Sequence, residues 1–397
     1  MVPAARQAFN AQFTEAQYEA YVKYLNDLYN YEIEFRIAET PIFIPRDLKH
    51  KVVKAGEHII DLITSPDFKA KTDRAVPPGL EVPNETPHTH FLAIDWAIST
   101  DEEGNFAPRL IELQGFPSLY GFQEVISQAA LKFWPIPDNF EYLFNGLDTS
   151  SYLALLAKVI QGEYAIENVI LLEIEPEKQK TKVDFYAMEQ LIGLRSVCLT
   201  DVMLEDRKLY YMRDGVRTRI NRIYNRVIFD ELQQRTDLKL AFDMRQDVDV
   251  EWAGHPAWFF RISKYILTML DSEFVPKTWF LNELTTIPTD LENYVLKPLF
   301  SFAGSGVLVN VTKADIEAIP DPENWILMKK VNYAPAVESL DIPVKVELRM
   351  LYLWPDGDAR PTLATSLVRM SKGLMMGVKF NKNFTWVGGS LAFFEAD

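Results

Sequence analysis

The sequence has almost no cysteine and no long apolar run. Its 397 residues include a single cysteine, Cys198, which excludes an internal disulfide and a cysteine-rich metal cluster. No stretch approaches the roughly 18 consecutive apolar residues that a membrane-spanning helix needs, and the first residues lack the apolar core of a secretion signal. We therefore expect a protein of the cytoplasm or another reducing compartment.

Positive charge is scarce as well. Lysine and arginine number 41 against 56 acidic residues, which gives a formal net charge of −15 at pH 7. Such a surface repels phosphate backbones and anionic lipids, so nucleic acid and membrane surfaces are poor partners, and any anionic ligand must be held by local cations. The hydrophobic share of 48% is that of a soluble globular protein, and the length predicts two or three structural units.

Residues 1–85 predict a helical scaffold. The segment Thr14–Gln17 is a capping-box pattern, and apolar residues follow it at helical spacing as far as Tyr29. A second helical pattern runs from about 47 to 62. The prolines between 76 and 87 predict an extended connector, because proline fixes φ and lacks the backbone donor.

The remaining chain predicts strands of two kinds. The runs 90–98 and 108–114, joined by an acidic turn, are typical of a β-hairpin in a segment 86–150. Between 160 and 240 strands alternate with helices, which predicts a small doubly wound unit with strands at 169–172, 196–199, 209–212 and 222–228. Residues 250–397 predict a helix and then mixed strands. The expected fold class is α+β with an α/β unit.

The segment 294–307 carries a lysine at the end of a strand and then a loop of small residues. Such a loop lets backbone N–H groups approach phosphate oxygens, while Lys297 supplies a point charge. It is no Walker A loop, because the lysine precedes the glycines. Elsewhere in the chain, no G-x-G-x-x-G follows the strand at 169, which argues against a dinucleotide-dependent oxidoreductase. A hairpin turn without any ligand explains the segment about equally well.

Glu112 and Gln114 lie two residues apart at the end of a strand, and therefore on the same face. Two oxygen donors beside phosphates suit Mg²⁺, although a solvated strand face is the simpler interpretation of this pair alone. The run 367–390 mixes cations, amides and a Gly-Gly pair with apolar residues in an otherwise acidic chain. It predicts a loop that handles an anion.

Taken together and in this order, these segments resemble the circularly permuted ATP-grasp ligases, the family of eukaryotic-type glutathione synthetase and glutathionylspermidine synthase. The resemblance is clearest over 91–119 and from about 169 onward. It implies an ATP-grasp fold with a permuted metal-binding strand in 86–150, a Rossmann-like substrate-binding subdomain at 160–240 and a nucleotide-binding domain at 250–397. It also implies ATP and Mg²⁺ as cofactors, and ligation of a carboxylate to an amine through an acyl phosphate. The substrates would be of the amino acid, peptide or polyamine type.

The resemblance implies roles for individual residues. Glu112 and Gln114 would bind the metal, with Gln114 standing where the family has asparagine. Lys297 and Lys264 would contact the phosphates, and Arg369 would meet the substrate and the acyl phosphate. The further nucleotide contacts implied are Ser301, Gly304, Ser305, Gly306, Met328, Lys329 and, near the ribose, Glu347. The substrate contacts implied are Ser118, Arg222, Arg226 and the pair Gly388 and Gly389, in a loop that closes over the cleft.

Several alternatives stay open at this stage. Gln114, together with Ser301 where glutathione synthetase has a glutamate metal ligand, also fits a degenerate protein that binds nucleotide or a partner without catalysis. A salt bridge from Arg226 to Asp230 or Glu231 is as good an interpretation as a grip on a carboxylate. The two histidines His88 and His90 have a spacing that suits zinc, but the sequence shows no third ligand. The oligomeric state is open, a homodimer included.

Overall fold

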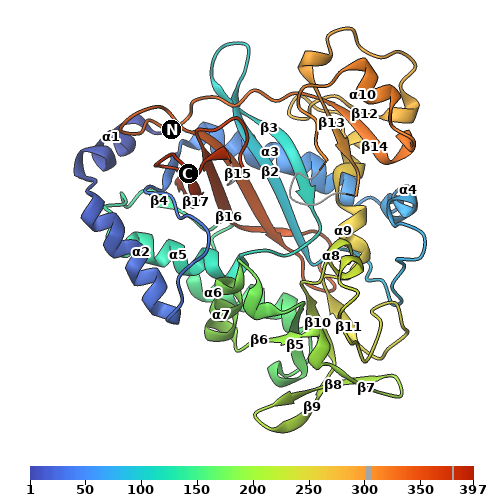
Figure 1. Ribbon diagram of the computed structural model, residues 1–397. Coiled ribbons are helices and arrows are strands. Elements are labelled where there is room, and N and C mark those ends of the chain that lie inside the picture. Colours follow the sequence, from blue (N-terminus) through green and yellow to red (C-terminus); the bar gives the residue numbers. More distant parts are fainter. Residues whose placement is uncertain (301–305, 378–379) are drawn as a thin grey trace.

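The computed structural model describes residues 1–300, 306–377 and 380–397 (Figure 1). Its centre is a five-stranded antiparallel sheet in the order β17-β16-β15-β2-β3. The strands are β2 (Phe91–Thr100), β3 (Phe106–Gln114), β15 (Lys345–Leu353), β16 (Thr362–Ser371) and β17 (Gly388–Ser390). The predicted hairpin is therefore confirmed, and its first strand pairs with β15 from the distant C-terminal part of the chain.

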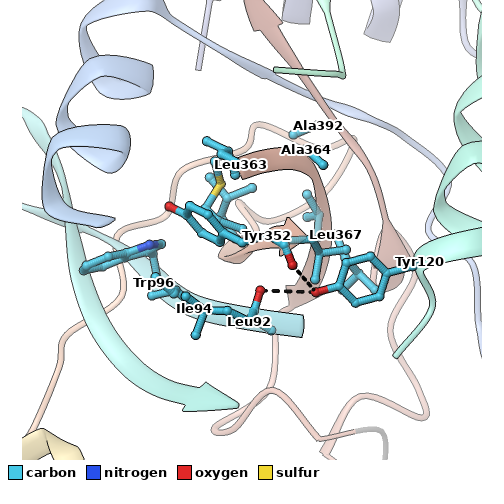
Figure 2. Packing of buried hydrophobic residues seen from close by; sticks show 14 of the residues in the cluster. Leu92, Ile94, Trp96, Tyr120, Tyr352, Leu363, Ala364, Leu367 and Ala392 are labelled. Carbon is cyan, nitrogen blue, oxygen red and sulfur yellow. Dashed lines mark hydrogen bonds between the residues drawn. The ribbon is translucent and has the colours of Figure 1, made fainter. Parts of the chain in front are cut away.

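Apolar side chains bury β2 on both of its faces. Its sequence is nearly continuous in hydrophobic residues, and every residue of the strand except Thr100 is buried. Tyr120 lies against this sheet and donates its hydroxyl to the carbonyls of Leu92 and Tyr352, at 3.2 and 3.0 Å (Figure 2). Because these hydrogen bonds satisfy the hydroxyl in an apolar setting, tyrosine is tolerated in this core.

The N-terminal helices pack into the same hydrophobic cluster as the central sheet. The predicted helices are confirmed as α2 (Glu15–Tyr29) and α3 (Arg46–Ile63), and the side chain of Thr14 caps α2 by accepting the N–H of Gln17. The same cluster includes residues of α1 (Pro3–Gln12), α5 (Tyr120–Phe133) and α6 (Thr149–Gln161). A small sheet, in the order β1-β18-β4, joins this region to the C-terminal residues through β1 (Ile42–Ile44), β18 (Ala392–Glu395) and β4 (Phe140–Glu141).

A second, parallel sheet has the order β11-β10-β5-β6. Its strands are β5 (Val169–Glu173), β6 (Arg195–Cys198), β10 (Arg222–Asn225) and β11 (Glu251–Ala253), and α7 (Lys182–Ile192) connects β5 to β6. The alternation of strand and helix predicted three of these strands correctly, at 169, 196 and 222. The fourth strand comes from beyond residue 240.

The prediction for 209–212 is wrong. This run forms β8 (Lys208–Arg213), which belongs to a separate antiparallel sheet with β7 (Met203–Glu205) and β9 (Val216–Ile220), at the lower edge of Figure 1. Asp214 and Gly215 both have positive φ, at 51° and 81°, and a two-residue turn of this kind joins antiparallel neighbours. A parallel crossover needs a connection of about a dozen residues or more, for which the chain has no room here.

The third region is the small antiparallel sheet β12-β14-β13, drawn in orange in Figure 1. Its strands are β12 (Thr278–Phe280), β13 (Tyr294–Pro298) and β14 (Trp325–Lys329), and a cluster of its own that includes Leu296 and Leu327 stabilises it. The remaining short helices are α4 (Phe68–Lys71), α8 (Phe229–Gln234), α9 (Ala257–Arg261) and α10 (Lys313–Glu317), with 3₁₀ turns at 73–75, 166–168, 176–178, 199–201, 264–269, 281–283, 291–293 and 322–324. In the described parts of the chain no helix combines the length and apolarity that crossing a membrane requires.

Candidate active site

Charged side chains gather on one face of the central sheet because of its register. Asp95 lies opposite Glu112 on one side and opposite Arg349 on the other. Two residues further along, Glu347 lies opposite Arg369. Since side chains two residues apart share a face of a strand, this register brings acids and arginines from four strands together.

The ion pairs of this cluster converge on Asp95. Its carboxylate accepts hydrogen bonds from Nε and Nη2 of Arg349, both at 2.6 Å, and from Nη2 of Arg369, also at 2.6 Å. The same Nη2 of Arg369 contacts Glu347 Oε1 and lies 3.5 Å from Glu112 Oε1. The side chains of Arg369 and Glu112 are 36% and 30% exposed, whereas that of Asp95 is fully buried. The cluster therefore opens to solvent on one side only.

Both arginines of the cluster stay protonated. Burial alone lowers the pKa of each guanidinium, but for Arg369 the charges of Glu347, Asp95 and Glu112 outweigh burial and raise its pKa. For Arg349, the charge of Asp95 and, more weakly, that of Glu112 also outweigh burial and raise the pKa. The two guanidinium groups therefore keep their positive charge throughout the physiological pH range.

Two buried polar atoms of the cluster have no hydrogen-bond partner. Tyr333 donates its hydroxyl to Glu347 Oε2 at 2.7 Å, but Oε1 of the same carboxylate and Nε of Arg369 are left without one. The contact between Arg369 Nη2 and Oε1 is short, yet it lacks the direction of a hydrogen bond. Buried atoms of this kind are rare in folded proteins and are typical of places where a ligand binds.

Two lysines lie beside Glu112. Lys297 is the penultimate residue of β13. Its Nζ donates to the carbonyl of Ile111 in β3, at 3.4 Å, and lies 3.2 Å from the sulfur of Met328. Burial lowers the pKa of Lys264 to about 8, while the charge of Glu112 opposes this change and that of Lys297 adds to it. Burial also lowers the pKa of Lys297, again against Glu112. An anion bound between these two ammonium groups would stabilise their charged forms, which burial disfavours.

A glycine places Lys264 next to the end of β3. Gly115 follows β3 directly and donates its N–H to the carbonyl of Ile262 at 3.1 Å. A Cβ atom at this position would lie 2.5 Å from the carbonyl oxygen of Trp258, so only glycine allows the two segments to approach so closely. The tight contact carries the chain from α9 to Lys264, close to Glu112.

The structure therefore brings together the predicted residues Glu112, Gln114, Lys264, Lys297, Met328, Glu347 and Arg369. Gln114 turns its amide toward Glu112 and donates to Oε1 at 3.0 Å. Glu347, for which the resemblance implies a place near the ribose, contacts Arg369 and accepts the hydroxyl of Tyr333. Gly306 has a φ of 72° and packs on Pro298, and Lys329 is exposed at the end of β14. Ser301, Gly304 and Ser305 lie outside the described residues.

The predicted substrate residues lie at several places. Arg226 follows β10, donates to the carbonyl of Pro117 next to Ser118, and stacks on Phe116 at 4.9 Å. Its Nε is buried without a partner. Asp230, one of the proposed salt-bridge partners, lies near enough to Lys264 for that ammonium to oppose the rise that burial causes in its pKa.

Gly388 and Gly389 form β17 instead of a loop. Gly389 pairs with Arg369 across the strands and donates its N–H to the carbonyl of Arg36 at 2.9 Å. Gly388 has a φ of 122°, and a Cβ there would clash with the same carbonyl. The pair therefore has a structural role, in which the chain around Arg36 approaches the sheet edge.

Arg222 does not reach this cluster. It is 2% exposed, and its guanidinium donates to the carbonyls of Val159 and Ile160 at the end of α6 and pairs with Glu251 and Asp356. A guanidinium at a helix C-terminus satisfies free carbonyls and complements the helix dipole. Arg222 thus joins the parallel sheet to α6 and to the turn after β15.

Sequence reasoning missed Asp95, Arg349 and Tyr333. The signal for Asp95 was available, because it is the only charge within the apolar run 91–98, and a carboxylate buried among apolar residues needs a cationic partner. Nothing local identifies that partner. Arg349 and Tyr333 contact the cluster through pairings between distant parts of the chain.

The donor set suits magnesium. Glu112 and Glu347 offer the carboxylate oxygens that Mg²⁺ prefers, and the unpartnered Oε1 of Glu347 is an atom that a cation would satisfy. As they stand, no three histidine, cysteine or acidic side chains in the described ranges are arranged to hold a metal ion. His88 stacks on Trp354 at 4.1 Å and His90 pairs with Asp356 at 2.9 Å, so both histidines have structural partners.

Two hollows lie elsewhere, beside β11 of the parallel sheet. Their volumes are about 450 and 400 Å³, and they share Asn84, Val250 and Glu251 in their walls. Of the predicted site residues only Arg222 lines one of them. They are open surface hollows and are separate from the charged cluster.

The architecture, a mixed α+β arrangement of several sheets and helices, is a glutathione synthetase-like fold. Among solved structures it is similar to a glutathione synthetase like-effector from Globodera pallida in its apo form, with a TM-score of 0.58. The match covers 100% of this chain and 99% of that chain at 10% sequence identity. No family model and no curated protein matches the sequence. The likeness thus concerns the fold alone.

Proposed function

We propose that this protein binds ATP and Mg²⁺ between the central sheet and the β12-β14-β13 sheet, in the manner of an ATP-grasp ligase. The observation that carries the proposal is the meeting of Lys264 and Lys297 with Glu112 at the border of these two sheets. Two ammonium groups whose pKa values are lowered by burial are ready to accept polyphosphate. The glutathione synthetase-like fold over the whole chain supports the same class of protein.

In this proposal each part of the site has a separate task. Lys264 and Lys297 neutralise the phosphates, and Met328 and Lys329 on β14 lie along the nucleotide. Glu112, Gln114 and Glu347 would hold magnesium, which supplies charge neutralisation and orients the transferred phosphoryl group when it is bound. Arg369 is a third exposed, so its guanidinium can meet the substrate carboxylate and stabilise the acyl phosphate until an amine attacks it.

The substrate would bind toward the parallel sheet. Arg226 lies just beyond the carboxyl end of β10, which is where ligands bind in sheets of this type. Its unpartnered Nε is available for a carboxylate. Burial raises the pKa of the neighbouring Glu173 to about 7, although Arg226 opposes the change. An amino acid, peptide or polyamine substrate presents groups that complement such a pair.

The test is thermal melting with and without MgATP, followed by an assay of ADP release with panels of amino acids, peptides and polyamines. At a hundredfold excess over its Kd the nucleotide adds about 2.7 kcal/mol of stability. We expect a magnesium-dependent rise in Tm, and ADP release that depends on both a carboxylate and an amine. A protein that melts identically with MgATP, with ATP in EDTA and without nucleotide would refute the proposal.

One observation favours a second function, a nucleotide-binding protein without ligase activity. Gln114 points its amide nitrogen at Glu112, so the metal site lacks one oxygen in this arrangement, and the similar solved protein is described as an effector. A rise in Tm with MgATP and no ADP release with any of the panels would favour this alternative.

Nucleotide binding should weaken as pH rises through about 8. Lys264 is protonated below its lowered pKa of about 8, and only the ammonium form attracts phosphate. Between pH 7 and 9 we expect the MgATP affinity to fall about tenfold, as the protonated fraction does. Lys264→Arg keeps its charge over this range and should show a flatter profile, in which only the lowered pKa of Lys297 still acts. The measurement is titration calorimetry at several pH values, and equal slopes for both proteins would contradict the role of Lys264.

A further inference from the structure

One guanidinium nitrogen has three carboxylates around it. Nη2 of Arg369 lies 2.6 Å from Asp95 Oδ2 and 3.5 Å from Glu112 Oε1, and contacts Glu347 Oε1. Oxygens of three acids, from β2, β3 and β15, face this nitrogen, and carboxylate oxygens are the ligands that Mg²⁺ prefers. With the guanidinium between them these acids are not arranged to hold a metal ion, as is true of every such group in the described residues. Arg369 therefore takes the place of a cation between Asp95 and two of the residues, Glu112 and Glu347, that the proposed function assigns to magnesium.

Asp95 does not need Arg369 as its counter-ion, because Arg349 already neutralises it. Arg349 is buried and binds Asp95 through two parallel hydrogen bonds, Nε to Oδ1 and Nη2 to Oδ2. Arg369 has only one of its nitrogens on Asp95, and its side chain is far more exposed, at 36% against 10%. Arg349 is thus the fixed partner of Asp95, and Arg369 is the arginine whose departure would leave Asp95 still neutralised.

Two further observations point to a ligand at this position. Glu347 is 2% exposed, and its Oε1 has no hydrogen bond although Arg369 lies against it. Nε of Arg369 is buried and also unpartnered. The guanidinium donates to Asp95 but leaves Glu347 Oε1 without a hydrogen bond, so a metal ion at this position would gain an oxygen ligand that the arginine does not satisfy.

We propose that Arg369 is a built-in competitor for the divalent cation. In the ligand-free protein its guanidinium occupies the position among Asp95, Glu112 and Glu347 and keeps the affinity for a free cation low. A cation that arrives with nucleotide phosphates, which Lys264 and Lys297 attract, displaces it, and the released guanidinium turns toward the substrate side of the cleft. The inference rests on the proposed function and adds the order of events: the arginine becomes available only once the cation is bound.

The test is titration calorimetry with Mn²⁺ in the absence of any nucleotide. Arg369→Gln removes the competing charge, and we expect it to bind Mn²⁺ at least about tenfold more tightly than the wild type, since one unit charge at this distance acts strongly even at an effective dielectric constant of 20. Arg369→Lys keeps the charge and should remain as weak as the wild type. Arg360→Gln, at an exposed ion pair with Glu57 and Asp61, controls for a general change of charge.

Equal Mn²⁺ affinities for Arg369→Gln and Arg369→Lys would overturn the inference. If Arg369→Gln does not fold, Arg369→Met replaces it, because methionine is also uncharged and of similar length. Adding Glu112→Gln to Arg369→Gln should abolish the gain, which locates the cation. This test and the test of the proposed function can fail separately. Tight Mn²⁺ binding by Arg369→Gln, with no effect of MgATP on wild-type melting, would support the competition between Arg369 and the cation and refute the nucleotide site.

Discussion

Lys297→Ala is expected to abolish ADP release and the MgATP-dependent rise in Tm without reducing the stability of the protein. Removing one fixed charge donor from a phosphoryl-transfer site costs on the order of 100-fold to 1,000-fold in rate. The stability should stay the same or increase, because burial lowers the pKa of this ammonium and so works against the folded state at neutral pH. Loss of activity together with unchanged or higher Tm is typical of a functional residue that costs stability.

Lys313→Ala is the matched control for Lys297. Lys313 is an exposed lysine in α10 of the same small region, and its pair with Glu317 is a surface contact. We expect full activity from this variant, and a change in stability below about 0.5 kcal/mol. ADP release by Lys297→Ala at the rate of the control would exclude a role for Lys297 with the phosphates.

Local patterns predicted most elements of the fold. Apolar residues at helical spacing identified α2 and α3, and the acidic turn between apolar runs identified the β2–β3 hairpin. Where the prediction for β8 was wrong, the deciding information was also local: Asp214-Gly215 is the turn that joins β8 to β9. Pairings between distant segments, such as β2 with β15, are not encoded in any short window.

The same distinction applies to the candidate site. Glu112 and Lys297 were found because each ends a strand beside a pattern with chemical meaning. The buried network of Asp95, Arg349 and Arg369 depends on the register of three strands, so the sequence showed only that a lone acid lay in an apolar run. Arg222 and Arg226 are the same residue type four positions apart, and only burial and partners separate the first, which joins α6 to the sheet, from the second.

Asp95→Ala is expected to be the most destabilising of the substitutions considered. Asp95 is fully buried and neutralises Arg349 through two hydrogen bonds and Arg369 through one. Its removal leaves the buried guanidinium of Arg349 with only the more distant carboxylate of Glu112, 3.6 Å away, and breaking a buried pair in this way costs about 3–5 kcal/mol. Arg349→Met should cost less, because Asp95 would retain Arg369 as a partner and methionine would fill the space of the aliphatic stem.

Urea unfolding at pH 7.5 measures these effects, with Arg360→Ala at its exposed pair as the control. The double variant Asp95→Ala/Arg349→Met should lose clearly less stability than the sum of the two single losses, since it removes both buried charges at once. In this double variant Arg369 still has Glu347 and Glu112 as partners, so its guanidinium can still compete with the cation. Additive losses, or a loss for Asp95→Ala no larger than for Arg360→Ala, would show that the buried pair contributes little to the folded state. The central sheet would then owe its stability to the apolar residues around Asp95 and not to the charges.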